Sequence, residues 1–151
     1  SNDMKFQKLS FEEMCTVAES LNIPHKELGY EIETWQDFFD WYNMVMDEDY
    51  KYDGRRIEGF VIEDSNGYMV KLKLAYYNFW KFMRSISHEA IKKGYIDPKR
   101  TAALVTPLAN QFYAWVKTLH DVEDLDSVPR NICTLRDMFY ESDSGKKFKD
   151  E

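Results

Sequence analysis

The chain has 151 residues, of which 44% are hydrophobic and 16% aromatic, enough to form one domain or two small lobes with a buried core. Its net charge of −7 argues against general binding of polyanions, because nonspecific affinity for nucleic acid comes mainly from neutralising phosphates. No apolar run approaches the length needed to cross a bilayer. Cys15 and Cys133 lack the spacing of metal ligands, and two isolated cysteines are typical of reduced thiols, so we expect a cytoplasmic protein.

The N-terminal part of the sequence predicts two helices with a short strand between them. Ser10 and Glu13 form a capping-box pattern at the start of the first helix, and Pro24 ends it. Residues 27–33 are predicted to be a strand, and Thr34 to cap the second helix. The apolar side chains of this second helix are expected to face the core: Trp35, Phe38, Phe39, Tyr42 and Met46.

Residues 56–74 predict a β-hairpin, because two runs rich in Ile, Val, Phe and Leu flank Asn66-Gly67. With a two-residue type I′ loop, Ser65 lies opposite Tyr68. In that register one face carries Glu58, Phe60, Ile62, Lys71 and Lys73, and the other face is apolar and faces the core. A three-residue loop would instead separate Glu58 from both lysines and turn them toward the core. We therefore predict the two-residue register.

Helices are predicted for the rest of the chain. The first spans residues 75–93 and is stopped by Gly94. Asp97-Pro98 and Thr106-Pro107 each predict a capped helix, and another helix is expected over residues 129–140. The residues from 81 to 100 form the most basic region, which is either an RNA-backbone surface or, more commonly, a solvated face: Lys81, Arg84, Lys92, Lys93, Lys99 and Arg100. The predicted fold class is α+β, with a small antiparallel sheet packed by helices and an all-helical C-terminal segment.

Glu58, Lys71 and Lys73 are the candidate site residues. Lysines supply compact positive charge for phosphate oxygens, and a carboxylate is a hard oxygen ligand for Mg²⁺. Beside apolar side chains, these groups suit a flat-ringed ligand that carries phosphates. The simpler alternative is a solvated hairpin face with a cross-strand Glu-Lys pair.

Glu58-Gly59-Phe60-Val61, followed after a short turn by Lys71-Leu72-Lys73, resembles the EGxV and KxK motifs of ATP-dependent RNA ligases, a nucleotidyltransferase family. The likeness is to the phage-type RNA ligase 1 branch and extends from about Glu33 to Arg84. The resemblance implies that Glu58 lies at the metal and nucleotide end of a pocket for ATP and Mg²⁺. It also implies that Lys71 and Lys73 contact the nucleotide phosphates, and that Phe60 or Val61 packs on adenine.

The nucleophile of that family is the lysine of a KxDG motif, and Lys51-Tyr52-Asp53-Gly54 has this pattern. In the family, however, a long stretch with other pocket-forming motifs separates KxDG from EGxV, and here only three residues do. We therefore interpret Asp53-Gly54 as an ordinary turn that leads into the strand, and Lys51 as an unlikely nucleophile.

The resemblance implies a C-terminal piece of an RNA ligase that works in RNA repair and acts on RNA together with the N-terminal remainder of the ligase core. The whole protein would be an enzyme, and this piece alone would be inactive. Residues 4–95 would belong to the nucleotidyltransferase core, 96–141 to a helical C-terminal segment and 142–151 to a flexible tail. The alternatives are a fragment of a DNA ligase or capping-type nucleotidyltransferase, and a non-catalytic interaction domain.

Overall fold

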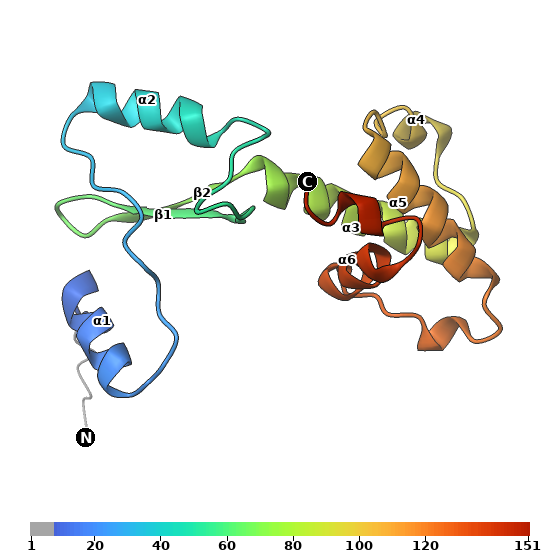
Figure 1. The fold of residues 1–151 in the computed structure, drawn as a ribbon, viewed down its shortest axis with the longest axis horizontal. Helices are drawn as coiled ribbons and strands as arrows, with labels where there is room; N and C mark the ends of the chain where they lie inside the picture. The colour runs from blue at the N-terminus through green and yellow to red at the C-terminus, as the bar shows by residue number, and fades with distance from the viewer. Residues whose placement is uncertain (1–7) are drawn as a thin grey trace, which may run out of the picture. The chain divides into compact units, whose positions relative to one another are not determined.

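A computed structural model describes residues 8–151 and confirms the predicted α+β class (Figure 1). The described chain falls into two compact units. The smaller unit comprises the chain up to Tyr50 together with Phe60–Leu72, and the larger comprises Lys51–Gly59 and Lys73–Glu151. Strands β1 (Gly59–Glu63) and β2 (Met69–Lys73) pair in a two-stranded antiparallel sheet.

Both N-terminal helices begin at the predicted caps. Helix α1 (Phe11–Ser20) has a complete capping box, in which the Ser10 hydroxyl accepts from the Glu13 amide at 3.2 Å and the Glu13 carboxylate accepts from the Ser10 amide at 2.8 Å. These contacts lower the pKa of the Glu13 carboxyl below its ordinary value. Helix α2 (Trp35–Val45) begins after Thr34, whose hydroxyl accepts from the Asp37 amide.

The buried face of α2 differs from the predicted one. Trp41 and Val45 are buried, whereas Trp35 is 78% exposed and Phe39 is 58% exposed. The helix therefore turns part of its aromatic stripe outward. The sequence pattern could not separate the two faces, because apolar residues occur on both sides of this helix.

The strand predicted over residues 27–33 is wrong, because this segment joins no ladder in the described chain. Aromatic packing holds it instead. The Tyr30 ring lies 5.9 Å from the Trp41 ring and 5.8 Å from the Phe60 ring, measured between centroids.

The predicted hairpin register is also wrong, because the loop has three residues. The Gly67 amide donates to the Asp64 carbonyl at 2.9 Å, and the Asp64 amide donates to the Tyr68 carbonyl at 3.0 Å. Gly67 has φ +79°, whereas Asn66 is not among the residues with positive φ, so the turn is not type I′. The Asp64 carboxylate selects this loop by accepting from the amides of both Asn66 and Tyr68, each at 2.9 Å.

This register changes which side chains of the two strands share a face within the smaller unit. Phe60, Ile62 and Leu72 are half-buried, whereas Val61 and Lys71 are exposed. The Phe60 ring packs against Trp41 with centroids 5.3 Å apart, which places α2 along the Phe60 face of the hairpin (Figure 1). In β1 the side that we predicted to carry the site, with Phe60 and Ile62, therefore faces the core. In β2 the prediction holds, because Leu72 is on the core side and Lys71 is exposed.

The larger unit is built around helix α3 (Ala75–Lys93), which ends at Gly94 with φ +79° as predicted. The other predicted helices are present: α4 (Pro98–Thr101) after the Asp97 cap, α5 (Pro107–Thr118) after the Thr106 cap, and α6 (Ile132–Glu141). Short 3₁₀ turns follow α5 and α6: η1 (Leu119–Asp121), η2 (Leu125–Ser127) and η3 (Lys146–Phe148).

The core of this unit lies between α3, α5 and α6, where Phe112 and Phe139 are fully buried with ring centroids 5.3 Å apart. Trp80 of α3 meets Phe112 edge-on, also at 5.3 Å. Phe148 of η3 is only 5% exposed and stacks on Phe139, in the segment that the sequence predicts to be a flexible tail. Edge-to-face contacts therefore join α3, α5 and α6, and a stacked pair joins α6 to η3.

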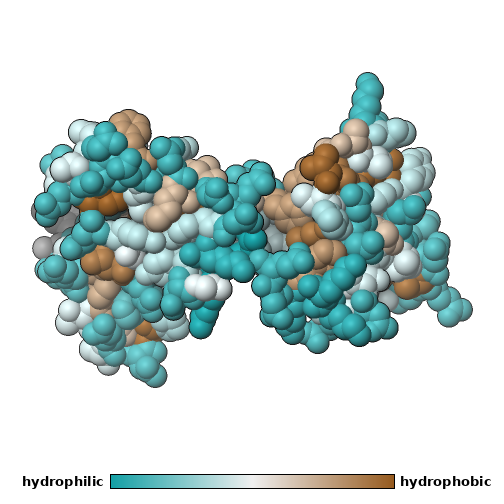
Figure 2. Space-filling model, turned by 45° about the horizontal axis from the view of Figure 1, so that its top comes forward, coloured by the Kyte–Doolittle hydropathy of each residue, from teal (hydrophilic) through white to brown (hydrophobic). Residues whose placement is uncertain are grey.

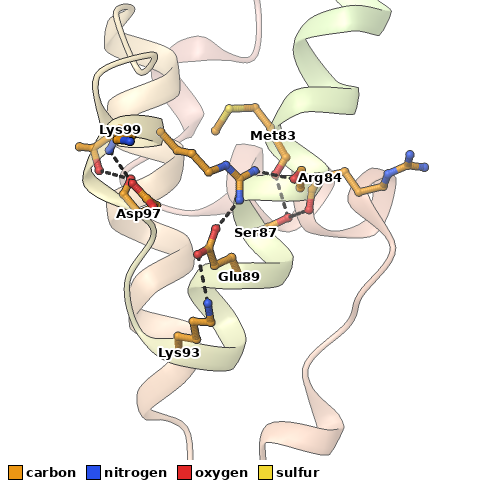
Figure 3. Close-up of polar contacts among 10 residues, drawn as sticks. Met83, Arg84, Ser87, Glu89, Lys93, Asp97 and Lys99 are labelled. Carbon is orange, nitrogen blue, oxygen red and sulfur yellow. Dashed lines mark hydrogen bonds and ion pairs between the residues drawn. The ribbon is translucent and has the colours of Figure 1, made fainter.

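A polar network ties α4 to α3 on the side shown in Figure 3. The Glu89 carboxylate lies between the Lys93 ammonium, at 3.3 Å, and the Arg100 guanidinium. Arg100 also donates to the Ser85 hydroxyl. Part of the predicted basic region is thus occupied by contacts within the unit, whereas the Arg84 side chain points away from this network (Figure 3).

Candidate functional site

Glu58 and Lys73 come together at the open end of the hairpin. Their carboxylate and ammonium groups are 3.6 Å apart, with side chains that are 65% and 40% exposed respectively. The Leu74 amide donates to the Glu58 carbonyl at 2.9 Å, which holds the two chain segments side by side. Glu58 lies in a bend just before β1, so strict strand alternation does not apply to it and its carboxylate reaches Lys73 despite the corrected register.

Lys73 also contacts the first turn of α3. Its ammonium group lies 4.3 Å from the centroid of the Tyr77 ring, a cation–π arrangement. Tyr77 follows Lys73 by four residues, across the junction of β2 and α3. The ammonium is thus positioned by a carboxylate and by an aromatic face.

The other predicted site residues lie in the smaller unit. Lys71 is exposed and, two residues before Lys73 in β2, points to the same side of that strand. Val61 is on the exposed face of β1, 36% exposed. Phe60 instead contributes its ring to an aromatic cluster, with centroids 5.3 Å from Trp41 and 6.2 Å from Tyr50.

Lys51 is exposed and precedes a tight turn. Asp53 and Gly54 have φ values of 49° and 71°, and the Tyr52 and Arg55 backbones exchange two hydrogen bonds of 2.8 and 2.9 Å. The predicted turn at Asp53-Gly54 is therefore confirmed, and its two positive φ values are those of type I′.

A small pocket of about 70 Å³ adjoins Glu58 in the larger unit. It lies between α3 and α6 and is lined by Glu58, Tyr76, Tyr77, Trp80, Lys81, Arg84, Ile132, Cys133 and Arg136. Arg136 donates to the Tyr76 hydroxyl at 3.0 Å across 60 sequence positions. The sequence analysis missed the α6 residues because no local pattern places α6 beside α3.

Arg136 is fixed by three neighbours. Besides Tyr76, the Asp137 carboxylate lies 3.2 Å away, and the guanidinium carbon lies 6.0 Å from the Trp80 ring centroid. Burial acts to lower the pKa of Arg136, but the acidic groups of Tyr76 and Asp137 outweigh it and raise this pKa. The guanidinium is therefore a permanent, oriented positive charge at the edge of the pocket.

The donor set fits Mg²⁺ only through a single carboxylate. Residues 8–151 contain no group of three or more His, Cys, Asp or Glu side chains able to hold a metal ion. Mg²⁺ is commonly bound by one or two carboxylates together with water and substrate phosphates, and the exposed Glu58 meets this requirement.

Within residues 8–151, no helix is long and apolar enough to cross a membrane. Cys15 and Cys133 are both free thiols.

The fold is α+β, and its hairpin ends in the exposed charged pair formed by Glu58 and Lys73. A family model described as RNA ligase matches residues 1–77, just over half of the 151 residues. The chain belongs to this RNA ligase family. The matched range includes Glu58, Lys71 and Lys73 and ends at Tyr77. No curated protein and no solved structure matches the chain.

Proposed function

We propose that this chain supplies the last two nucleotide-binding motifs of an ATP-dependent RNA ligase. In the proposed reaction a lysine elsewhere in the enzyme attacks the α-phosphate of ATP and forms lysyl-AMP with release of pyrophosphate. AMP then passes to an RNA 5′-phosphate, which frees the lysine, and a 3′-hydroxyl displaces AMP to seal the strand. The observation that supports this most strongly is the Glu58–Lys73 pair, at 3.6 Å, inside the range that the RNA ligase family matches.

Lys73 and Lys71 are assigned to the nucleotide phosphates. A compact ammonium beside a phosphate under transfer offsets the charge that develops on its oxygens. The existing contact of Lys73 with Glu58 does not prevent this, because an exposed ion pair contributes about 0–1 kcal/mol and is readily exchanged. Tyr77 would keep the Lys73 ammonium in place during that exchange.

Glu58 is assigned to Mg²⁺ or to the nucleotide, as a single hard oxygen donor. When bound, Mg²⁺ would help to neutralise the phosphate groups. For the apolar contact with adenine we propose Val61 rather than Phe60. Val61 is exposed on the hairpin face opposite to the Phe60 ring, and that ring is already packed against Trp41.

The remainder of the ligase core is the partner that this proposal requires. In the smaller unit, α2 exposes Trp35, Phe39 and Tyr42 at positions i, i+4 and i+7. Figure 2 shows separate brown groups among the teal of the surface. Exposed aromatic side chains on one helix are candidates for a protein interface. In this proposal residues 4–95 complete the nucleotidyltransferase core, 96–141 form its helical extension, 142–151 end it, and the enzyme repairs RNA in the cytoplasm.

An intact-mass measurement tests the absence of the nucleophile. Incubated with ATP and Mg²⁺, the chain should acquire no AMP adduct, because Lys51 precedes an ordinary type I′ turn. An adduct of AMP mass that disappears in Lys51→Ala would contradict the proposal.

A sealing assay tests the enzyme class. The chain is joined to the upstream ligase core, and sealing of 5′-phosphorylated RNA is compared for wild type, Lys73→Ala, Glu58→Ala and the control Lys92→Ala. Lys92 is an exposed lysine of α3 outside the site. Loss of sealing in the first two variants alone supports the proposal. Equal activity in all four would favour a non-catalytic interaction domain, and sealing of DNA but not RNA would favour a DNA ligase.

A further inference from the structure

The pocket between α3 and α6 is strongly basic. Lys81 and Arg84 come from α3 and Arg136 from α6, whereas Glu58 is the one acidic residue in its lining. A pocket of about 70 Å³ has room for a few water molecules or one phosphate-sized group, but not for a whole nucleotide. Its size and charge therefore indicate a small anion.

Arg136 is held in place before any ligand arrives. Its hydrogen bond to Tyr76 and its position over the Trp80 ring restrict the guanidinium, which keeps further N–H donors in a planar fork. Such a fork matches the oxygens of a phosphate, and less side-chain entropy is lost on binding because the group is already oriented.

The charged groups of Lys81 and Arg84 are able to bind an anion in the pocket. Both are exposed, and within residues 8–151 neither side chain makes an ion pair. They lie at positions i and i+3 of α3, so they share one side of the helix. Figure 3 shows the Arg84 guanidinium directed away from the Glu89 network that occupies Arg100 and Lys93.

We propose that this pocket binds the terminal 5′-phosphate of an RNA strand. Counted with their ion-pair partners Lys73 and Asp137, the charged groups are four cations and two carboxylates, which leave a net charge of 4 − 2 = +2. This charge matches a phosphate monoester of about −1.5 to −2 better than a backbone diester of −1. The inference rests on the proposed function, because Glu58 both lines this pocket and pairs with Lys73. A 5′-phosphate here would lie beside the group that we assign to the nucleotide.

Binding of short single-stranded RNA, labelled at its 3′ end, tests the proposal by fluorescence anisotropy. A 5′-phosphorylated strand should bind about tenfold more tightly than the same strand with a 5′-hydroxyl, because charge-assisted hydrogen bonds are gained. The double variant Lys81→Gln/Arg84→Gln should lose this preference. The matched control Lys92→Gln/Lys99→Gln removes the same charge from exposed positions outside the pocket and should keep it.

Thiol alkylation locates the bound end. Cys133 lines the pocket and is exposed, whereas Cys15 lies in α1 and serves as an internal reference. The 5′-phosphorylated strand should slow the reaction of N-ethylmaleimide with Cys133, followed by mass spectrometry, and leave Cys15 unchanged. Equal affinity for both strands, equal effects of the two double variants, or unprotected Cys133 in the bound state would each overturn the inference.

Failure here is distinguishable from failure of the proposed function. Sealing that depends on Lys73 and Glu58 but not on Lys81 and Arg84 would overturn the pocket assignment and leave the ligase proposal in place. Selective binding of the 5′-phosphorylated strand without any Lys73-dependent sealing would support the assignment of the pocket and contradict the proposed ligase reaction.

Discussion

The Lys73 ammonium lies 3.6 Å from the Glu58 carboxylate, across the open end of the hairpin, although the register of the strands is not the one that would place these residues side by side. The bend at Glu58 makes this contact independent of the alternation along β1. The pair is exposed and linked to helix α3 through Tyr77. It is therefore suited to exchange partners with a ligand rather than to stabilise the fold.

We expect Glu58→Gln and Lys73→Gln each to change the free energy of unfolding by no more than about 1 kcal/mol, because exposed ion pairs and exposed cation–π contacts contribute little. Urea unfolding measures this. Leu74→Ala is the comparison: its side chain is 3% exposed, and its loss should cost about 2–4 kcal/mol. A large destabilisation by Lys73→Gln would show that the pair is structural and would weaken its use in the sealing assay.

We expect Asp64→Ala to lower the free energy of unfolding by about 1–2 kcal/mol, because two backbone amides of the hairpin loop lose their acceptor. Asp64→Asn keeps an acceptor oxygen and should remain close to wild type. Glu63→Ala, an exposed acidic neighbour, is the control. If Asp64→Ala and Glu63→Ala behave alike in urea unfolding, the Asp64 carboxylate does not select the three-residue loop.

Gly145→Ala should be among the most damaging small substitutions in the larger unit. A Cβ atom at this position would lie 1.9 Å from the Phe139 carbonyl oxygen, so the turn between α6 and η3 has to move. We expect a loss of about 2–3 kcal/mol, typical of overpacking, in thermal or urea unfolding.

Gly54→Ala is the matched control for that substitution. Its Cβ would meet no atom within 4 Å, and only the φ of 71° opposes it, at about 1–2 kcal/mol. A Gly145→Ala variant as stable as wild type would mean that the η3 turn does not pack closely against α6.

Tyr140 should make stability fall at alkaline pH. Burial, and then the acidic group of Tyr76, raise the pKa of Tyr140 from 10.0 to about 12. Because the folded state holds this proton more tightly than the unfolded state, the contribution is complete below pH 10 and is lost as the pH rises toward about 12. The unfolding free energy of wild type should therefore fall more steeply in this range than that of Tyr140→Phe.

Tyrosinate absorbance measures the pKa of Tyr140 directly. The difference between wild type and Tyr140→Phe isolates one of the ten tyrosines. Tyr95→Phe is the control, because Tyr95 is 60% exposed. A Tyr140 difference curve centred near pH 10 would contradict the prediction.

Five helix boundaries could be predicted from the sequence because their signals are local. The start of α6 could not: it was predicted at residue 129, whereas Asn131 caps the helix and Ile132 begins it. Ser10, Thr34, Asp97, Thr106 and Gly94 all occupy the cap positions predicted for them. The hairpin loop was mispredicted because Asn66-Gly67 is preceded by Asp64, and a side-chain acceptor two residues earlier favours a different turn. The type I′ turn is found at Asp53-Gly54 instead.

Only the site residues that lie in the two sequence motifs could be predicted. Glu58 and Lys73 were found because their spacing resembles EGxV and KxK. The burial of Phe60 depends on its contact with Trp41 of α2. The local sequence around either residue does not indicate this pairing. The pocket depends on Arg136 reaching Tyr76 across 60 positions, and the burial of Phe148 depends on a single aromatic residue in a polar segment.

Helix α3 runs without interruption from Ala75 to Lys93, although the family match stops at Tyr77, within its first turn. Met83, Ile86 and Ile91 are fully covered, and their covering core includes Phe112, Leu135 and Phe139. A chain shortened soon after Gly94 would retain Glu58, Lys71 and Lys73, yet one side of the helix that carries Tyr77 would lose its apolar cover. The proposed ligase should accordingly need the chain through η3, well past Lys73.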